Sequence, residues 1–153
     1  MTHGSRWVSL TGVYEPDNIF ARIIRGEAPA AKVFEDAATI AFLDVFPQSE
    51  GHTLVIPKEG AARNLLDADP AILAPLMRTV QRVGRALITT LNPDGLIVTQ
   101  FNGQAAGQTV FHLHVHLIPR WRGRELARHA GGAMANADDL ARLAARIAAA
   151  VVE

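Results

Sequence analysis

Within TVFHLHVHLIPR, the stretch from Thr109 to Arg120, apolar and polar residues alternate strictly from Phe111 to Leu117. A period of two is typical of a β-strand, because successive side chains of a strand point to opposite faces. The aliphatic positions are expected to enter a core, and the alternate positions hold His112, His114 and His116. Next-but-one side chains on a strand lie about 6.5–7 Å apart, so the pattern predicts three imidazoles along one groove.

The remaining apolar positions predict four more strands and three helices. The strand-like runs are short and closely connected, as in an antiparallel sheet, and cover residues 32–36, 39–45, 52–58 and 96–102. Helical spacing is found in residues 18–29, 67–91 and 136–152. Pro75 would remove a hydrogen bond inside the second helix, which is therefore expected to begin there after a separate turn. Asn136 is a suitable cap for the third helix, and the whole pattern predicts an α+β domain.

Composition limits the class of protein. A chain of 153 residues favours one domain, here residues 18–153, preceded by an N-terminal arm of residues 1–17 that contains no recognisable motif. Lys and Arg together number 15, as do Asp and Glu, so no overall field would attract nucleic acid or an anionic membrane. Cysteine is absent, and no apolar run approaches the roughly 18–20 residues of a membrane span. These features favour a cytoplasmic protein.

The three histidines allow three interpretations. Buried structural histidines would each need polar partners, because desolvating an imidazole without them is costly. A metal site is a second possibility, since H-x-H on a strand can place two rings on one zinc, with His52 as a remote further ligand. The chain has no cysteine, however, and no aspartate stands within about ten residues of His112, His114 and His116.

Phosphate chemistry is the third interpretation, and the preceding loop favours it. NGQAAGQTV, residues 102–110, contains two glycines, several side-chain amides and a hydroxyl. Backbone N–H groups of such a loop can hold a phosphate without fixed charge. A neutral imidazole can attack phosphorus and form a covalent intermediate, while neighbouring imidazoles donate hydrogen bonds to the phosphoryl oxygens.

At HLHVHLI (112–118) the chain resembles the histidine triad (HIT) nucleotide-binding and hydrolase proteins, whose pattern is His-φ-His-φ-His-φ-φ with φ apolar. The resemblance extends from about Asn18 to Trp121 and includes NIFARIIRGEAPA and FLDVFPQSEGHTLVIPK. Within this family, the chain most resembles bacterial members of the purine-nucleoside phosphoramidase (Hint-like) branch. The resemblance implies a five-stranded antiparallel sheet with a long central helix and a C-terminal helix, and a homodimer with a continuous ten-stranded sheet.

The resemblance also implies an activity, which is hydrolysis of the bond between a purine nucleoside α-phosphate and a leaving group, in a phosphoramidate or a dinucleoside polyphosphate. His114 would be the nucleophile that carries the nucleotidyl group. His112 and His116 would orient it and hold the phosphate, and Thr109 would assist the leaving group. The implied nucleotide contacts are Asn102 and Gln108 beside the phosphate, Asp44 at the ribose, Ile19, Phe20 and Ile23 against the purine, and Val45, Gly107 and Val110 around them.

Three departures from the family pattern qualify these expectations. Many bacterial relatives have Cys-x-x-Cys where this chain has Asn18 and Ala21, so no structural zinc is expected, and the predicted chemistry requires no metal or cofactor. The triad reads His-Leu-His and not the His-Pro-His of nucleotidyl-transferring relatives, which favours water as the acceptor. The chain beyond Trp121 does not match, so the leaving group (an amine, a lysine adduct, a second nucleotide or a sulfate) stays open. A nucleotide sensor or scaffold with incidental hydrolysis is the alternative function.

Overall fold

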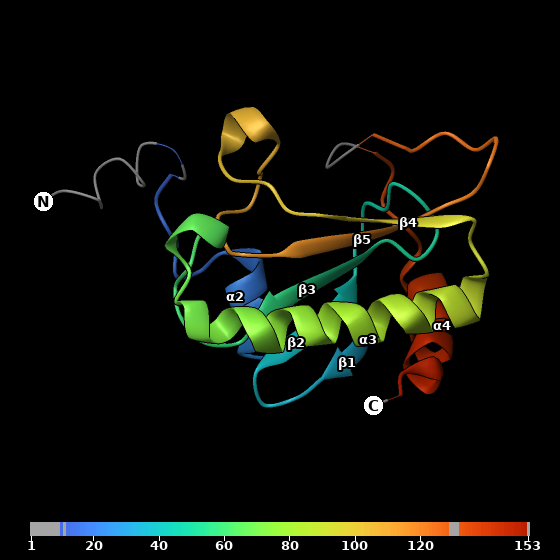
Figure 1. The fold of residues 1–153 in the computed structure, drawn as a ribbon, viewed down its shortest axis with the longest axis horizontal. Helices are drawn as coiled ribbons and strands as arrows, with labels where there is room; N and C mark the ends of the chain where they lie inside the picture. The colour runs from blue at the N-terminus through green and yellow to red at the C-terminus, as the bar shows by residue number, and fades with distance from the viewer. Residues whose placement is uncertain (1–9, 11, 129–131, 153) are drawn as a thin grey trace, which may run out of the picture.

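The computed structural model describes residues 10, 12–128 and 132–152. Five strands form one antiparallel sheet in the order β1-β2-β3-β5-β4 (Figure 1), which confirms the α+β fold. Their bounds are Lys32–Glu35 for β1, Thr39–Leu43 for β2, Thr53–Pro57 for β3, Gly95–Thr99 for β4 and Val115–Arg120 for β5.

Helices cover both faces of the sheet, and two apolar cores result. The long α3 (Leu73–Leu91) and the C-terminal α4 (Ala137–Ala150) pack on one face, against side chains that include Leu43, Val55 and Leu117. The short α2 (Ile19–Ile24) packs on the other face through Phe20 and Ile23, which meet Ile40, Phe42, Leu54 and Ile56. Because side chains alternate along β5, His116 projects to the face of α2. No helix within the described ranges has the length and apolarity to cross a membrane.

The start of α4 follows the predicted cap, whereas the start of α3 differs from the prediction. Asn136 caps α4 by accepting hydrogen bonds from the N–H groups of Asp138 and Asp139. The expected turn before the long helix is present as two 3₁₀ helices, η1 (Leu65–Asp67) and η2 (Pro70–Ile72). The helix itself begins at Leu73 and not at Pro75. Pro75 is tolerated because the N–H groups of the first helical turn have no partner within the helix.

The predicted histidine strand is too long. β5 begins only at Val115, so His112 and His114 precede the strand and His116 alone lies within it. The cause is a change of hydrogen-bonding partner, since the N–H of Leu113 donates to the carbonyl of Ala62 and not to a neighbouring strand. The strand predicted at 96–102 likewise ends at Thr99, and the loop that follows contains η3 (Gln104–Ala106) and rises above one end of the sheet (Figure 1).

Candidate active site

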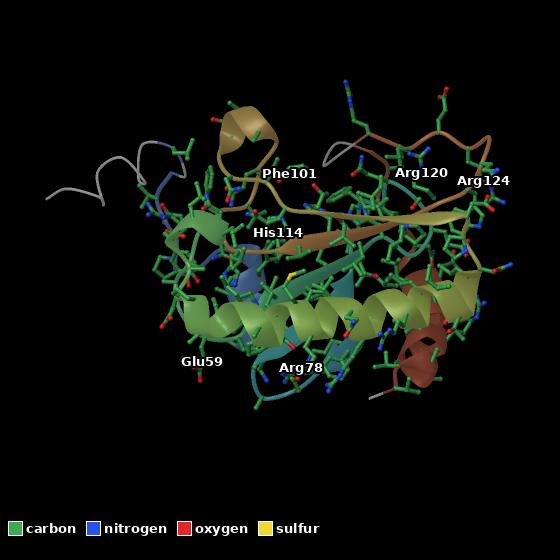
Figure 2. The ribbon with its side chains drawn as sticks, in the orientation of Figure 1. Glu59, Arg78, Phe101, His114, Arg120 and Arg124 are labelled. Atoms are coloured by element: carbon green, nitrogen blue, oxygen red, sulfur yellow. The ribbon has the colours of Figure 1, made fainter. Side chains whose placement is uncertain are left out.

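His114 lies near the start of β5, beneath the loop that contains η3 (Figure 2). Its ring stands between two others, with centroids 4.9 Å from the ring of Phe20 and 4.9 Å from the ring of His116. The Nδ1 atom of His114 is 2.6 Å from the backbone carbonyl oxygen of His112, the contact expected of an oriented nucleophile. A carbonyl only accepts hydrogen bonds, so Nδ1 carries the proton and, in the neutral ring, the lone pair is on Nε2.

His116 is oriented by a histidine that is distant in the sequence. The backbone N–H of Gln48 donates to Nδ1 of His52 at 3.0 Å, so the proton of neutral His52 is on Nε2. That Nε2 lies 3.0 Å from Nδ1 of His116 and donates to it, which places the proton of His116 on its own Nε2. Both rings are buried. The sequence pointed to His52 only as a remote metal ligand, and its contact with the triad was missed.

The surroundings of His52 and His116 contain ligand atoms that could hold a metal ion. One ligand atom each from Asp44, His52 and His116 lie within 4.8 Å of one another, and the Asp44 carboxylate is 3.6 Å from Nε2 of His52. A metal on that Nε2 needs a lone pair, but the N–H of Gln48 already holds the lone pair of His52 on Nδ1. The direction of these hydrogen bonds therefore favours a series of hydrogen bonds from Gln48 through His52 to His116 over a metal centre.

The position of the relatives' Cys-x-x-Cys does not fit a zinc ion either. The Oδ1 atom of Asn18 accepts hydrogen bonds from the N–H groups of Phe20 and Ala21, at 2.9 and 3.0 Å, and thereby caps α2. The side chain of Ala21 has no donor atom for a metal. Neither residue can replace the thiolate ligands that structural zinc prefers.

His112 is held by the segment that precedes α2. Its Nδ1 atom lies 3.3 Å from Nδ2 of Asn18 and 3.1 Å from the hydroxyl oxygen of Tyr14. The pKa of His112 is lowered from 6.5 to about 4, chiefly by burial; a hydrogen bond to the Pro57 carbonyl acts in the opposite direction, and the nearby His114 contributes to the lowering. His112 is therefore neutral at pH 7. The sequence provided no motif that would single out Tyr14.

The loop before the triad is organised by the buried side chain of Gln108. Its Oε1 accepts hydrogen bonds from the N–H of Gly103 at 2.9 Å and from the amide of Asn64 at 3.2 Å. Its Nε2 donates to the carbonyls of Arg63 at 2.6 Å and Val110 at 3.0 Å. These four bonds satisfy the whole amide. Gln108 therefore shapes the loop, and Asn64, which the sequence did not single out, supports it from a second segment.

The other predicted loop residues differ in exposure. Thr109 is exposed, and Asn102 and Gly107 are half-buried. The Oδ1 of Asn102 accepts a hydrogen bond from Gln100 at 3.0 Å. Val110 is also half-buried and packs against the core beneath α2. Val110 thus lies on the side of the sheet on which Phe20 meets the rings of His112 and His114.

The residues predicted to contact the nucleoside fall into a buried and an exposed group. Phe20 and Ile23 are buried in the core under α2, while Ile19 and Val45 expose 43% and 44% of their surface and could still contact a ligand. Asp44 is half-buried, and its Oδ1 accepts a hydrogen bond from the N–H of Phe46 at 2.8 Å. Its other oxygen faces His52, so the carboxylate lies beside the histidine chain.

An antiparallel five-stranded sheet with a glycine-containing loop and three histidines at the start of its strand β5 defines a histidine triad protein. A family model described as the HIT domain matches residues 25–123. The chain belongs to this family. A solved HIT-like protein from Bartonella henselae, described as involved in cell-cycle regulation, superposes with a TM-score of 0.84 at 46% identity, covering 90% of this chain and 98% of that one.

Two of the relatives are named for an enzymatic activity. The adenosine 5'-monophosphoramidase hnt1 of Schizosaccharomyces pombe is 41% identical over 104 residues, which are 67% of this chain and 73% of the relative. The adenylylsulfatase HINT3 of Arabidopsis thaliana is 37% identical over 119 residues, which are 74% of this chain and 60% of the relative. Chains similar to this one thus include enzymes that are named for different leaving groups.

Proposed function

We propose that this protein is a hydrolase that cleaves the bond between a purine nucleoside α-phosphate and its leaving group. The observation that carries the proposal is the 2.6 Å contact between Nδ1 of His114 and the carbonyl of His112. Nε2 of neutral His114 attacks the α-phosphorus, a P–N bond forms, and the bond to the leaving group breaks. Water then attacks the phosphorus, the P–N bond breaks, and the nucleoside monophosphate leaves.

The two neighbouring histidines have different proposed roles. Nε2–H of His116 donates a hydrogen bond to a phosphoryl oxygen, and His52 holds the tautomer that allows this. Both ring nitrogens of His112 are engaged within the protein, at Tyr14 and Asn18 on one side and at Pro57 on the other. His112 therefore orients His114 through its carbonyl, and its ring does not bind the phosphate.

The remaining proposed contacts are those that the resemblance to the HIT family implies. Exposed Thr109 assists the leaving group, and Asn102 and Gly107 lie beside the phosphate in the loop that Gln108 shapes. Asp44 accepts hydrogen bonds from the ribose hydroxyls. The exposed Ile19 and Val45 contact the purine, with half-buried Val110 beside them, and the buried Phe20 and Ile23 support this apolar wall from the core under α2. The reaction uses no metal or cofactor, and the cytoplasm, which contains nucleotides, is the proposed location.

A homodimer is the proposed assembly, and one apolar surface supports it. β4 is an edge strand of the sheet, and a cavity of about 340 Å³ between β4 and α3 is lined mainly by apolar side chains. Met77 on α3 and Val98 on β4 expose 49% and 47% of their surface beside this cavity. Pairing of two β4 edges around a two-fold axis would cover these side chains and continue the sheet.

Turnover measurements test the proposed function directly. Adenosine phosphoramidate, diadenosine polyphosphate and adenylyl sulfate are incubated side by side with the protein and with a His114→Ala variant. Release of AMP from at least one substrate by the wild-type protein alone supports the hydrolase. Tight binding of purine nucleotides without turnover of any of the three favours the sensor or scaffold, because both functions use the same site.

A further inference from the structure

The segment before α2 packs across the predicted phosphate loop and the first histidine of the triad. A Cβ atom on Gly103, whose φ is +95°, would come within 2.5 Å of the carbonyl oxygen of Leu10. A Cβ on Gly12 would approach the ring of Phe111 to 3.0 Å, and the carbonyl of Gly12 accepts a hydrogen bond from Arg63 at 2.7 Å. The described part of the arm therefore lies against the site.

Two side chains at the end of this segment converge on one nitrogen of His112. The hydroxyl of Tyr14 is 3.1 Å and the amide nitrogen of Asn18 is 3.3 Å from Nδ1. The orientation of the Asn18 amide is fixed, because Oδ1 accepts the two N–H groups of the α2 cap. The atom that faces His112 is therefore Nδ2, which can only donate. Nδ1 of His112 must accept, and the Tyr14 hydroxyl also donates to it.

We propose that Tyr14 and Asn18 are positioning residues that hold His112 as the neutral tautomer with its proton on Nε2. The proton on Nε2 is donated to the carbonyl of Pro57, so the ring is held from both sides. Phe20 adds an edge contact, with ring centroids 6.0 Å apart. The assignment rests on hydrogen-bond geometry, and only its catalytic consequence rests on the proposed function.

The catalytic consequence passes through the backbone of His112. The carbonyl of this residue accepts the Nδ1–H of His114, so a rotation of the His112 ring and its peptide would move the group that orients the nucleophile. Tyr14 and Asn18 thus act on His114 indirectly, through His112. They touch neither the phosphate nor the leaving group in this arrangement, which distinguishes them from catalytic residues.

Two cations lie near the ring of His112. Arg25 and Lys58 line a cavity of about 240 Å³ beside the ring, together with Tyr14. Arg25 forms ion pairs with Asp17 and Glu27, and Lys58 pairs with Glu35, so these cations are themselves partly compensated. A carboxylate introduced at position 18 would reverse the local preference, because it can accept a proton from Nδ1.

Asn18→Asp is the decisive variant. An aspartate caps a helix as well as an asparagine does, so α2 is retained, but the group that faces Nδ1 changes from a donor to an acceptor. Asn136→Asp makes the same exchange at the cap of α4 and is the matched control. Tyr14→Phe keeps the ring and removes only the second donor.

The state of His112 is read from ¹⁵N shifts of the histidine ring nitrogens in labelled protein, assigned with a His112→Gln variant. The wild-type protein and Asn136→Asp should show the neutral Nε2–H pattern at pH 7. Asn18→Asp should show a doubly protonated or Nδ1–H ring, and Tyr14→Phe a smaller change in the same direction. Unchanged His112 shifts in Asn18→Asp, or a wild-type ring with its proton on Nδ1, would overturn the proposal.

Activity provides the second readout. Loss of one orienting hydrogen bond should lower kcat about threefold to tenfold in Tyr14→Phe, and at least as much in Asn18→Asp, with little change in KM. Unchanged kcat in both variants would overturn the link to His114. A wild-type protein without turnover would overturn the proposed function alone, because the ¹⁵N shifts report on His112 without any substrate.

Discussion

Nε2 of His52 donates a hydrogen bond to Nδ1 of His116 across 3.0 Å, although the two residues are 64 positions apart in the chain. The backbone N–H of Gln48 fixes the direction of this bond. We therefore expect His52→Ala to lower turnover by about tenfold or more, because His116 would lose the partner that sets its tautomer.

Glutamine is the matched replacement for His52, since its amide N–H can occupy the place of the Nε2–H of the histidine. His52→Gln should retain more activity than His52→Ala in steady-state kinetics on the same substrate. Equal activity of wild-type protein and His52→Ala would show that the contact is structural only.

Replacement of His114 separates binding from chemistry. His114→Ala or His114→Asn should abolish turnover yet still bind nucleotide, because the loop and Asp44 are unchanged. Rapid quenching of wild-type protein with labelled substrate should trap an acid-labile, base-stable nucleotidyl group on His114. His112 and His116 variants should react slowly but still form this intermediate. A label on any other residue contradicts the assignment.

Metal removal should leave the reaction intact. The direction of the bond from Gln48 to His52 opposes a metal at the cluster of Asp44, His52 and His116, and Asn18 and Ala21 cannot replace zinc-binding thiolates. Activity is measured before and after dialysis against EDTA, with metal content checked by mass spectrometry. Activity that is lost with EDTA and restored by zinc would support a metal-dependent mechanism instead.

Acid should destabilise the fold through His112. Its folded-state pKa is lowered to about 4 from 6.5, mainly by burial, so the neutral form stabilises the native state. This contribution is complete above about pH 6.5, the unfolded value, and is lost as the pH falls towards about 4. Between pH 7 and 5 the loss should reach about 2 kcal/mol of unfolding free energy, measured by urea denaturation. His112→Gln removes the titrating group, so its unfolding free energy should fall less over this range; an equal fall would assign the effect to other groups.

The proposed dimer predicts a solution mass of twice the 16.5 kDa chain at micromolar concentration, measured by light scattering. Met77→Lys places a charge in the apolar surface between α3 and β4 and should shift the protein towards monomer. Met134→Lys is the control, because Met134 is also exposed but lies outside that surface. A wild-type mass of one chain would refute the dimer.

Local patterns in the sequence were sufficient to predict most of the secondary structure. The period of two in the strands and the helical spacing of α3 and α4 reflect which side chains must be buried, and this is a property of neighbouring residues. The cap at Asn136 is equally local, since a capping side chain bonds to N–H groups two or three positions away. The triad was predictable because its three histidines are adjacent in one motif.

The partners of those histidines were not predictable, because they come from distant segments. His52 reaches His116, Tyr14 reaches His112 and Asn64 reaches Gln108, in each case after the chain has folded back on itself. Distant partners also explain why β5 was predicted to start too early. Alternation shows which side of the sheet a residue faces, but it does not show whether a neighbouring strand or a loop accepts the hydrogen bond of its N–H group. The sequence alone identified the three imidazoles of the triad. The tertiary structure added the imidazole of His52 and decided which nitrogen of each ring carries the proton, since that depends on the donor or acceptor that packing brings to it.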